Sequence, residues 1–391
     1  MICSSSSPPI RRRPGEGRGP RGFTLVELLT VILILAVLIT LLLPALNFAV
    51  STAKNAAVGG EINQLAQALA SFKAKYGDYP PSRIYLSEDG NLMPANGSTQ
   101  IATGDITYAQ LGQRSIAAMR KFFPRVTFNL GTATNNWYDF NGDGLQYIGT
   151  TNVAQWYILS GHECLVFFLG GVPMQTVTGY GMTGFGKDPT NPFTNSLAGK
   201  AGYSANRQPP FFEFNASRLA VDLTNPTLPG IPGYLDSLGN TLGNGMTNFY
   251  AYFSAYGNNG YDPNDVNFAE SDVNGNGPIG LGYHVAFPVT GGCISAGPNP
   301  YTSSFTTPTT GLPTFLNPQS FQIISSGIDG LYGVGGQYQP DNTAGTLPYD
   351  SSSTYYLNTT ATPPSWTADS DPSIRYRERD NVTNFHNGKL E

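Results

Sequence analysis

The fold is decided by residues 23–43, FTLVELLTVILILAVLITLLL, an apolar run of 21 residues whose single charge is Glu27. As a helix rising ~1.5 Å per residue, this run extends about 30 Å, the thickness of a bilayer's hydrocarbon core. It exceeds the apolar core of an ordinary secretory signal, and the following LPAL at residues 43–46 lacks a small-residue cleavage site. We therefore predict a membrane-spanning helix that anchors the chain.

The charge distribution predicts how the chain is oriented. Residues 1–22 contain five arginines and one acidic residue, Glu16, whereas the whole chain has a net charge of -5. Positive segments stay in the cytoplasm, so the residues after Pro44 are expected on the far side of the inner membrane. Because those residues are acidic and contain no stripe of Lys and Arg, no nucleic-acid partner is expected.

The composition predicts a folded but loop-rich head over residues 77–391. Hydrophobic residues make up 40% of the chain and aromatic residues 12%, enough for a core. The 46 glycines and 30 prolines indicate many turns. We expect inserted loops at about 294–318 and 334–379, which are rich in Ser, Thr, Pro and Asn.

A second helical pattern follows Pro44. Apolar residues from Leu46 to Tyr76 recur at three- and four-residue steps, which predicts an amphipathic helix over 45–76 that ends at Gly77 and two prolines. A helix is also expected over 106–122, a short apolar element over 162–169, and strands over 126–130, 211–214, 281–289 and 321–325. The predicted fold class is α+β: a long N-terminal helix, with a membrane half and an amphipathic half, packed on an antiparallel-sheet head.

Residues 21–28, RGFTLVEL, resemble the cleavage and methylation motif of type IV prepilins and type II secretion pseudopilins. Gly22 stands before the cut and Phe23 after it, with Glu27 four residues further on and Pro44 at a helix proline of many pilins. The resemblance implies that a prepilin peptidase removes residues 1–22 and methylates the new amine of Phe23. Residues 23–44 would then form the transmembrane and filament-core helix.

Glu27 is expected to act in assembly. A charged side chain at the centre of a bilayer costs about 2.5–3.5 kcal/mol, so a carboxylate there calls for a partner. In a stack of subunits, the amine of one Phe23 can neutralise Glu27 of its neighbour. The alternative is a glutamate at the membrane interface, where the cost is small. Pro44 removes a backbone hydrogen bond, and we expect local unwinding there when subunits enter a filament.

A second resemblance concerns the major pseudopilin of type II secretion. Residues 76–82, YGDYPPS, resemble the end of that family's helix, residues 321–333 its strand and glycine-aspartate turn, and residues 380–385 its closing acidic strand. The resemblance implies a calcium loop containing Asp329 and Asp380. Residues 334–379 are inserted between them, and the aspartate run typical of that loop is missing.

A further calcium pattern lies in the head. Asp139, Asn141 and Asp143 occupy the first, third and fifth places of a calcium loop, with Gly144 at the sixth. Thr150 stands at the twelfth place, where a bidentate acid belongs, and an ordinary turn remains the alternative. A weaker copy begins at residue 272. The interpretation requires no cofactor, and Ca²⁺ is the one ligand that the sequence suggests.

Cysteine and enzyme motifs add little. Cys164 and Cys293 would form one disulfide in an oxidising compartment, or both would remain buried thiols. The G-x-x-x-x-G-K pattern at 181–187 is followed by Asp188 instead of Ser or Thr, and no G-x-S-x-G occurs. The chain is therefore not predicted to be an enzyme.

The sequence predicts a structural subunit of a type IV pilus-like or type II secretion filament, periplasmic or extracellular once assembled. Its expected partners are copies of itself in a helical polymer, sister pseudopilins, the prepilin peptidase, and the assembly ATPase with its inner-membrane platform. Two alternatives remain: a membrane-anchored monomeric binding or adhesion protein, and a tethered extracellular hydrolase.

Overall fold

The computed structural model describes residues 22, 24–94, 97–99, 101, 106–128, 137–145, 156–176, 179–221, 230–238, 249–256, 260–266, 298, 300–302, 315–328, 332, 335, 338, 355–358, 365–368, 379–386 and 388–390. These residues belong to two compact units, Met1–Thr52 and Ala53–Glu391.

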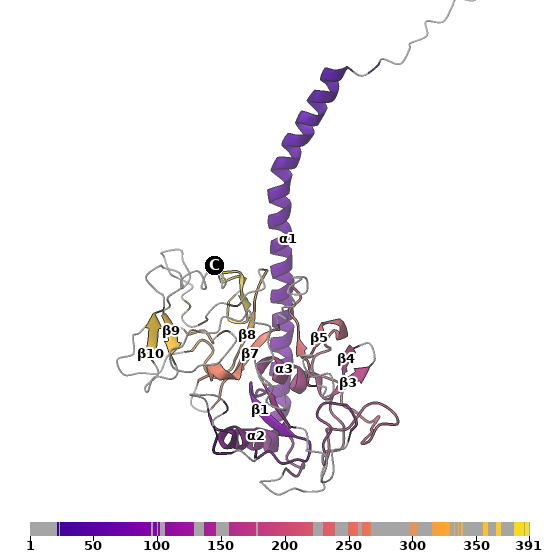
Figure 1. Cartoon of the computed structure of the whole chain (residues 1–391), viewed down its shortest axis with the longest axis vertical. Coiled ribbons are helices and arrows are strands. Elements are labelled where there is room, and N and C mark those ends of the chain that lie inside the picture. The colour runs from indigo at the N-terminus through magenta and orange to yellow at the C-terminus, as the bar shows by residue number, and fades with distance from the viewer. Residues whose placement is uncertain are drawn as a thin grey trace, which may run out of the picture. The chain divides into compact units, whose positions relative to one another are not determined.

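Helix α1 (Leu25–Tyr76) contains both predicted helical segments (Figure 1). It ends as predicted: the N–H of Gly77 donates to the Lys73 carbonyl oxygen at 2.7 Å, and Gly77 has a φ of +84°. Such a left-handed glycine is a common C-terminal stop. Gly59 and Gly60 lie inside the helix without interrupting it.

Within the second unit, α1 buries one face. Its buried apolar residues are Val58, Ile62, Leu65, Ala68, Leu69 and Phe72. The Phe72 ring lies 5.2 Å from that of Phe122 in α2 (Tyr108–Phe122) and 5.8 Å from that of Phe168 in α3 (Gly161–Gly170). The burial starts at Asn55, whereas Leu46 and Val50 of the predicted face are exposed.

Helices α2 and α3 follow from their sequences. Thr107 caps α2 in a reciprocal capping box with Gln110, so the predicted helix begins two residues later than expected. The apolar element predicted over 162–169 is α3, in which every residue except Glu163 is buried. A helix surrounded by core needs no polar face, which explains the continuous apolar run.

Among the described residues, the named strands pair in antiparallel fashion. Two-stranded pieces are formed by β1 (Ile84–Ser87) with β2 (Trp156–Leu159), β3 (Pro173–Thr176) with β4 (Gly179–Met182), β5 (Leu219–Ala220) with β6 (Gly233–Tyr234), and β9 (Tyr355–Asn358) with β10 (Ser365–Ala368). A three-stranded sheet has the order β11-β8-β7, from β7 (Ala251–Ser254), β8 (Phe321–Ser325) and β11 (Val382–Thr383). Two short 3₁₀ helices, η1 (Ala216–Arg218) and η2 (Pro263–Asp265), complete the described elements. The predicted α+β class is confirmed.

The three-stranded sheet is buried on both faces. Tyr252 and Ile323 belong to the main core with α1, while Phe253 and Ile324 belong to a second core that includes Tyr301. Consecutive strand residues point to opposite faces, so every position of a strand between two cores is buried. In β8 the polar Gln322 is buried by pairing its side-chain amide with the backbone N–H and carbonyl of Tyr301, and Phe321, Ile323 and Ile324 supply the apolar content that predicts the strand over 321–325.

Two of the predicted strands are wrong. Residues 126–128 and 211–214 lie outside helices and strands. The N–H of Val126 donates to the Phe123 carbonyl in a turn after α2, and the N–H groups of Phe211 and Phe212 both donate to the Leu169 carbonyl in α3. The strand expected over 281–289 lies outside the described residues. Residues 334–379 were expected to be loop but contain the β9–β10 hairpin.

An ion pair fixes α1 to the rest of the second unit. The Arg218 guanidinium donates to both oxygens of Glu61, at 2.6 and 2.8 Å. Tyr234 and Tyr250 donate their hydroxyls to the same carboxylate at 3.0 and 2.5 Å. Burial opposes ionisation of Glu61, but these hydrogen bonds outweigh it and leave its pKa below the ordinary value.

Candidate functional sites: the amino-terminal helix and a buried carboxylate cluster

Of the predicted processing and assembly residues, Glu27 lies in the first turn of α1. Gly22 is exposed just before it, and Phe23 lies outside the described residues. Thr24 and Glu27 form a capping box: the Thr24 N–H donates to Glu27 Oε2 at 2.8 Å, and the Glu27 N–H donates to Thr24 Oγ1 at 3.2 Å. This pair satisfies two backbone donors at the helix start and places a negative charge at the positive end of the helix dipole.

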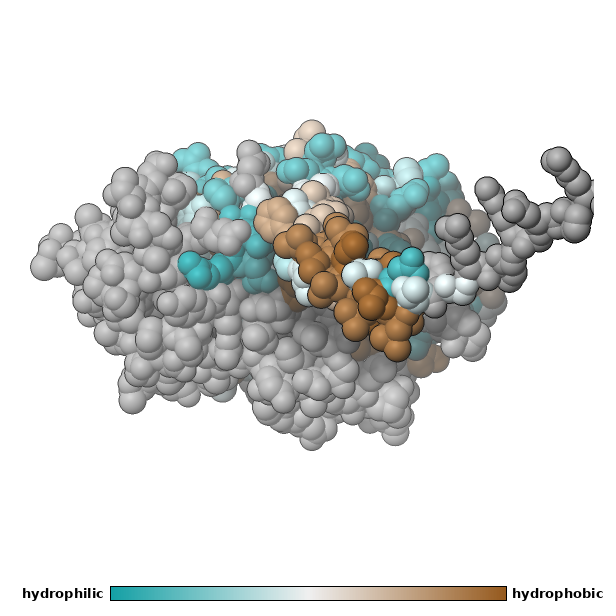
Figure 2. Space-filling view, turned by 90° about the horizontal axis from the view of Figure 1, so that it is seen from above, coloured by the Kyte–Doolittle hydropathy of each residue, from teal (hydrophilic) through white to brown (hydrophobic). Residues whose placement is uncertain are grey.

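The first unit presents an uncovered apolar surface. Every residue from 25 to 50 is exposed, and its large hydrophobic side chains are 46% to 79% accessible. Figure 2 shows hydrophobic side chains gathered in one continuous brown surface. By length and composition, α1 is able to cross a membrane. An exposed apolar surface of this extent marks a membrane or protein interface.

Pro44 lies inside α1, and the helix continues on both sides of it. Proline has no N–H, so the carbonyl of Thr40 cannot receive the usual helical hydrogen bond from this position. The Thr40 hydroxyl donates to the Val37 carbonyl at 2.8 Å and adds a local bond in the preceding turn. The expected unwinding at Pro44 concerns the assembled filament and stays a prediction.

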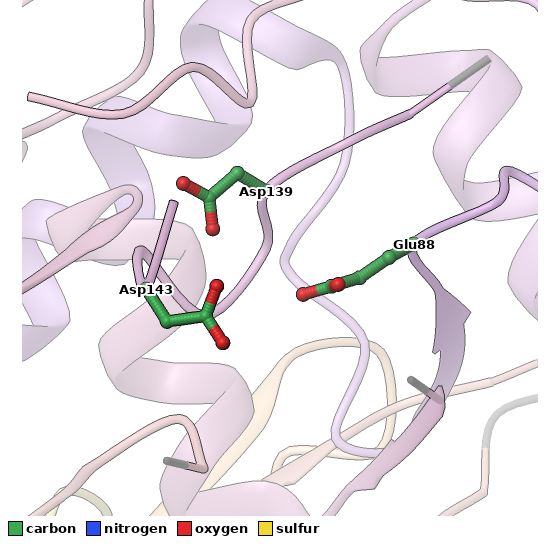
Figure 3. Close-up of side chains that lie close together, drawn as sticks. All are labelled: Glu88, Asp139 and Asp143. Carbon is green, nitrogen blue, oxygen red and sulfur yellow. The ribbon is translucent and has the colours of Figure 1, made fainter. Parts of the chain in front are cut away.

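In the head, three carboxylates from distant parts of the chain converge. Glu88 follows β1, and Asp139 and Asp143 lie in the loop predicted to bind calcium (Figure 3). One oxygen from each of the three carboxylates lies within 4.8 Å of those of the other two. Glu88 and Asp139 are fully buried and Asp143 is 6% exposed.

The loop around Asp139 is held by hydrogen bonds within the loop and by a bond from Asn195. Asp139 Oδ2 accepts from Asn195 Nδ2 at 2.7 Å and from the Gly144 N–H at 3.1 Å. Asn141 donates its amide to Asp143 Oδ2 at 2.9 Å, and its oxygen accepts from the Asp143 N–H. The turn requires glycine at position 142, where φ is +74° and an added Cβ would lie 1.8 Å from the Pro173 carbonyl oxygen.

The surroundings of Glu88 and Asp139 disfavour the ionised form of each carboxyl group. Burial raises the pKa of Glu88 well above its ordinary value, and the charges of Asp143 and Asp139 raise it further. Burial also raises the pKa of Asp139 to about 6, although the hydrogen bond from Asn195 opposes the shift. Glu88 Oε1 accepts from the Tyr157 hydroxyl at 3.2 Å, whereas Glu88 Oε2 and Asp139 Oδ1 have no hydrogen-bond partner.

The remaining predicted residues do not enter this cluster. Asp380 Oδ2 accepts from the Ile328 N–H at 2.6 Å and closes the turn after β8. Its expected companion Asp329 lies outside the described residues, as do Thr150 and the loop at 272–277. Cys164 is buried in α3. Its pairing is untested because Cys293 also lies outside the described part.

Glu88 was missed by sequence reasoning. It precedes Asp139 by 51 residues, so a search for ligands at fixed local spacing does not connect the two. The available signal was a glutamate placed directly after the short apolar segment IYLS, where a strand end can direct a side chain into the interior.

Comparison with known proteins identifies the amino-terminal segment. Residues 17–43 match the prokaryotic N-terminal methylation motif. The matched segment includes Gly22, Glu27 and the whole apolar run up to residue 43. No curated protein and no solved structure matches the chain.

Proposed function

We propose that this chain, a type IV pilin-like or pseudopilin-like protein by its methylation motif and apolar helix, is a structural subunit of a type IV pilus-like or type II secretion filament. The observation that carries the proposal is α1, in which every residue from 25 to 50 is exposed and nearly all are apolar or small, Glu27 and Asn47 being the exceptions, and whose start lies within the processing motif. Such a surface needs a bilayer before assembly and neighbouring helices afterwards. The motif points to a structural rather than an enzymatic protein.

Processing prepares the helix for assembly. A prepilin peptidase removes residues 1–22 from the cytoplasmic side and methylates the amine of Phe23. The amine then lies next to Thr24, at the start of the capping box with Glu27. None of the described lysines and arginines forms an ion pair with Glu27, so its carboxylate can receive the Phe23 amine of a neighbouring subunit.

The machinery follows from this role. The inner-membrane platform and its ATPase extract the anchored subunit, and copies of the chain with sister pseudopilins stack through residues 23–44. The head, residues 77–391, forms the outer surface of the filament, outside the membrane. The core that joins α1 to the head contains Phe72 and Leu65, so pulling on the helix also moves the head.

The first experiment measures the intact mass of the chain from native membranes and from sheared extracellular material. We expect both forms to lack residues 1–22 and to carry one added methyl group, and we expect the sheared fraction to contain the chain. A cleaved chain confined to membranes would favour a monomeric anchored binder. A retained leader would contradict the processing step.

A pair of variants separates charge from helix capping. Glu27→Gln keeps the capping-box geometry but cannot form an ion pair, while Thr24→Ala removes the cap and keeps the charge. We expect both variants to be cleaved and only Glu27→Gln to give a severe loss of sheared filament. Normal filament yield from Glu27→Gln would exclude charge pairing between subunits.

A further inference from the structure

We propose that the head binds one calcium ion between Glu88 and the Asp139–Asp143 loop, with Glu88 as the acid that the loop itself lacks. The ligand is a hard divalent cation, because the side chains that converge are all carboxylates. This inference concerns the folded head and does not depend on filament assembly.

The spacing of the carboxylates suits calcium. Ca²⁺–oxygen distances are about 2.3–2.6 Å, so two ligands on opposite sides of one ion lie about 4.6–5.2 Å apart. The three oxygens of the cluster lie within 4.8 Å of one another, which allows a single ion to contact all three without rearrangement. Figure 3 shows the three carboxylates directed toward a common space.

Two oxygen atoms in the cluster lack a partner. Glu88 Oε2 and Asp139 Oδ1 are buried and accept no hydrogen bond. Buried carboxylate oxygens are normally hydrogen-bonded, paired with a cation or bound to a metal. A bound cation satisfies both atoms at once.

No described basic side chain neutralises the cluster. The three carboxylates form no ion pair with any lysine or arginine in the described ranges. The nearest ammonium that contacts the loop, Lys200 Nζ, donates to the Asp143 backbone carbonyl at 2.9 Å. Arg207 is close enough to interact electrostatically with Asp139 but forms no ion pair with it among the described residues. A divalent ion would supply a counter-charge in direct contact with all three acidic groups.

The loop has the shape of the first half of a calcium loop. Gly142 and Gly144 both have positive φ, at +74° and +66°, and fold the backbone tightly around Asp143. Asn195 donates to both Asp139 Oδ2 and the Gly142 carbonyl, at 2.7 and 2.9 Å, and fixes the loop from outside. Glu88, from a separate segment, then takes the role that a bidentate acid plays at the twelfth place of a continuous loop.

The ion would add a further link between two segments, β1 and the Asp139–Asp143 loop, that already pack in the main core. The turn after β1 already contacts the loop through the Tyr138 N–H, which donates to the Glu88 carbonyl at 2.8 Å. Phe140, in the same loop, packs in the main core 4.6 Å from Phe193. Calcium at Glu88 would therefore tie the strand β1 to this core, and head stability would depend on calcium.

The test titrates CaCl₂ into the full chain, purified in mild detergent and freed of metal with EDTA, by isothermal calorimetry. We expect one site per chain, with an affinity of about 10⁻⁴–10⁻³ M or tighter, as in extracellular calcium modules. MgCl₂ should bind at least about tenfold more weakly, because Mg²⁺ needs shorter bonds and gives up its water reluctantly. Absence of calcium binding, or equal binding of magnesium, overturns the proposal.

Isosteric variants locate the site. Glu88→Gln and Asp139→Asn should each weaken calcium binding at least about tenfold. The control Asp188→Asn changes an exposed aspartate whose carboxylate caps Thr190, and it should bind as the unaltered chain does. Undiminished binding in both cluster variants places the ion elsewhere and overturns the proposal.

Thermal unfolding separates loss of the ion from loss of the fold. In EDTA, Glu88→Gln should be at least as stable as the unaltered chain, because it removes one of three mutually repelling acids. In calcium, the unaltered chain should become the more stable of the two. A Glu88→Gln chain that is less stable in EDTA would contradict the proposal, since the carboxylate would then stabilise the head without an ion.

Discussion

The ion pair between Glu61 and Arg218 makes the attachment of α1 to the head quantitatively testable. The perturbation is Glu61→Gln, which keeps the size of the side chain but removes its charge. Arg218 and two tyrosine hydroxyls donate to this carboxylate, and the two charged side chains are only 15% and 12% exposed. Glutamine retains one acceptor oxygen and brings an amide that faces the Arg218 donors.

The expected cost follows from burial. Removing one partner of a buried ion pair costs about 3–5 kcal/mol because the other charge is left uncompensated. Arg218 keeps its hydrogen bond from Nε to the Leu235 carbonyl at 2.9 Å and its stacking over Tyr234, so the cost should lie at the low end. The retained acceptor of glutamine restores about 1 kcal/mol. We expect Glu61→Gln to lower the free energy of unfolding by about 2 kcal/mol.

An exposed ion pair provides the control. Lys121 and Asp78 are also 2.6 Å apart, but their side chains are 48% and 51% exposed. Exposed pairs contribute about 0–1 kcal/mol, so Asp78→Asn should change the free energy of unfolding by less than about 1 kcal/mol. The assay is urea unfolding of the full chain in mild detergent, followed by fluorescence, with a shifted midpoint and an unchanged slope.

Coupling and pH decide whether the reasoning is right. The double variant Glu61→Gln with Arg218→Met should have nearly the same free energy of unfolding as Arg218→Met alone, because the two residues act as a unit. Since the folded-state pKa of Glu61 is lowered, its contribution is complete above the unfolded value near 4.5 and is lost as pH falls through the folded value. Equal costs for Glu61→Gln and Asp78→Asn would refute the argument.

Further predictions concern the free energy of unfolding and use the same urea assay. Phe72→Ala should cost about 3–5 kcal/mol, since this ring is fully buried between α2 and α3; a cost under 1 kcal/mol would contradict that packing. Gly142→Ala should lower the free energy of unfolding by at least about 2 kcal/mol because its Cβ meets the Pro173 carbonyl. Gly60→Ala, whose Cβ would have no atom within 4 Å, should raise the free energy of unfolding by up to about 1 kcal/mol. If Gly60→Ala were the more destabilising of the two, both expectations would be refuted. Burial raises the pKa of Asp236 to about 6, so stability should fall as pH rises from about 4 to 6; this slope should become shallower in Asp236→Asn and keep only the part due to other buried acids such as Asp139, and an unchanged slope would contradict the contribution of Asp236.

The amino-terminal half of the protein follows from sequence because its signals are local. The apolar run and the three- and four-residue periodicity predict α1, and Gly77 sets its end. The apolar positions of residues 106–122 similarly predict α2, which Thr107 caps in the structure. These patterns depend on neighbours within one or two helical turns, so tertiary packing does not overrule them.

The head is less predictable because its structure depends on distant partners. The segment at 211–214 has the aromatic content of a strand, yet its backbone bonds to Leu169 at the end of α3. The cluster depends on distant partners in the same way. Asp139 and Asp143 form a recognisable local pattern, while Glu88 comes from a separate segment whose backbone meets their loop where the Tyr138 N–H donates to the Glu88 carbonyl. The strands of the head are short, so the sequence shows little of the apolar and polar alternation that would predict them.

The order of strands in the three-stranded sheet has a consequence for folding. β7 begins at residue 251, β8 at residue 321 and β11 at residue 382, so the sheet cannot close until residues 382–383 have been made and have reached it. The Val382 side chain also lies 4.0 Å from where a side chain at Gly59 would begin, beside the part of α1 that is made early. Segments from opposite ends of the second unit thus meet in one core. Until the β11 segment joins, the β8 edge stays open, so the head is completed only by its latest segment.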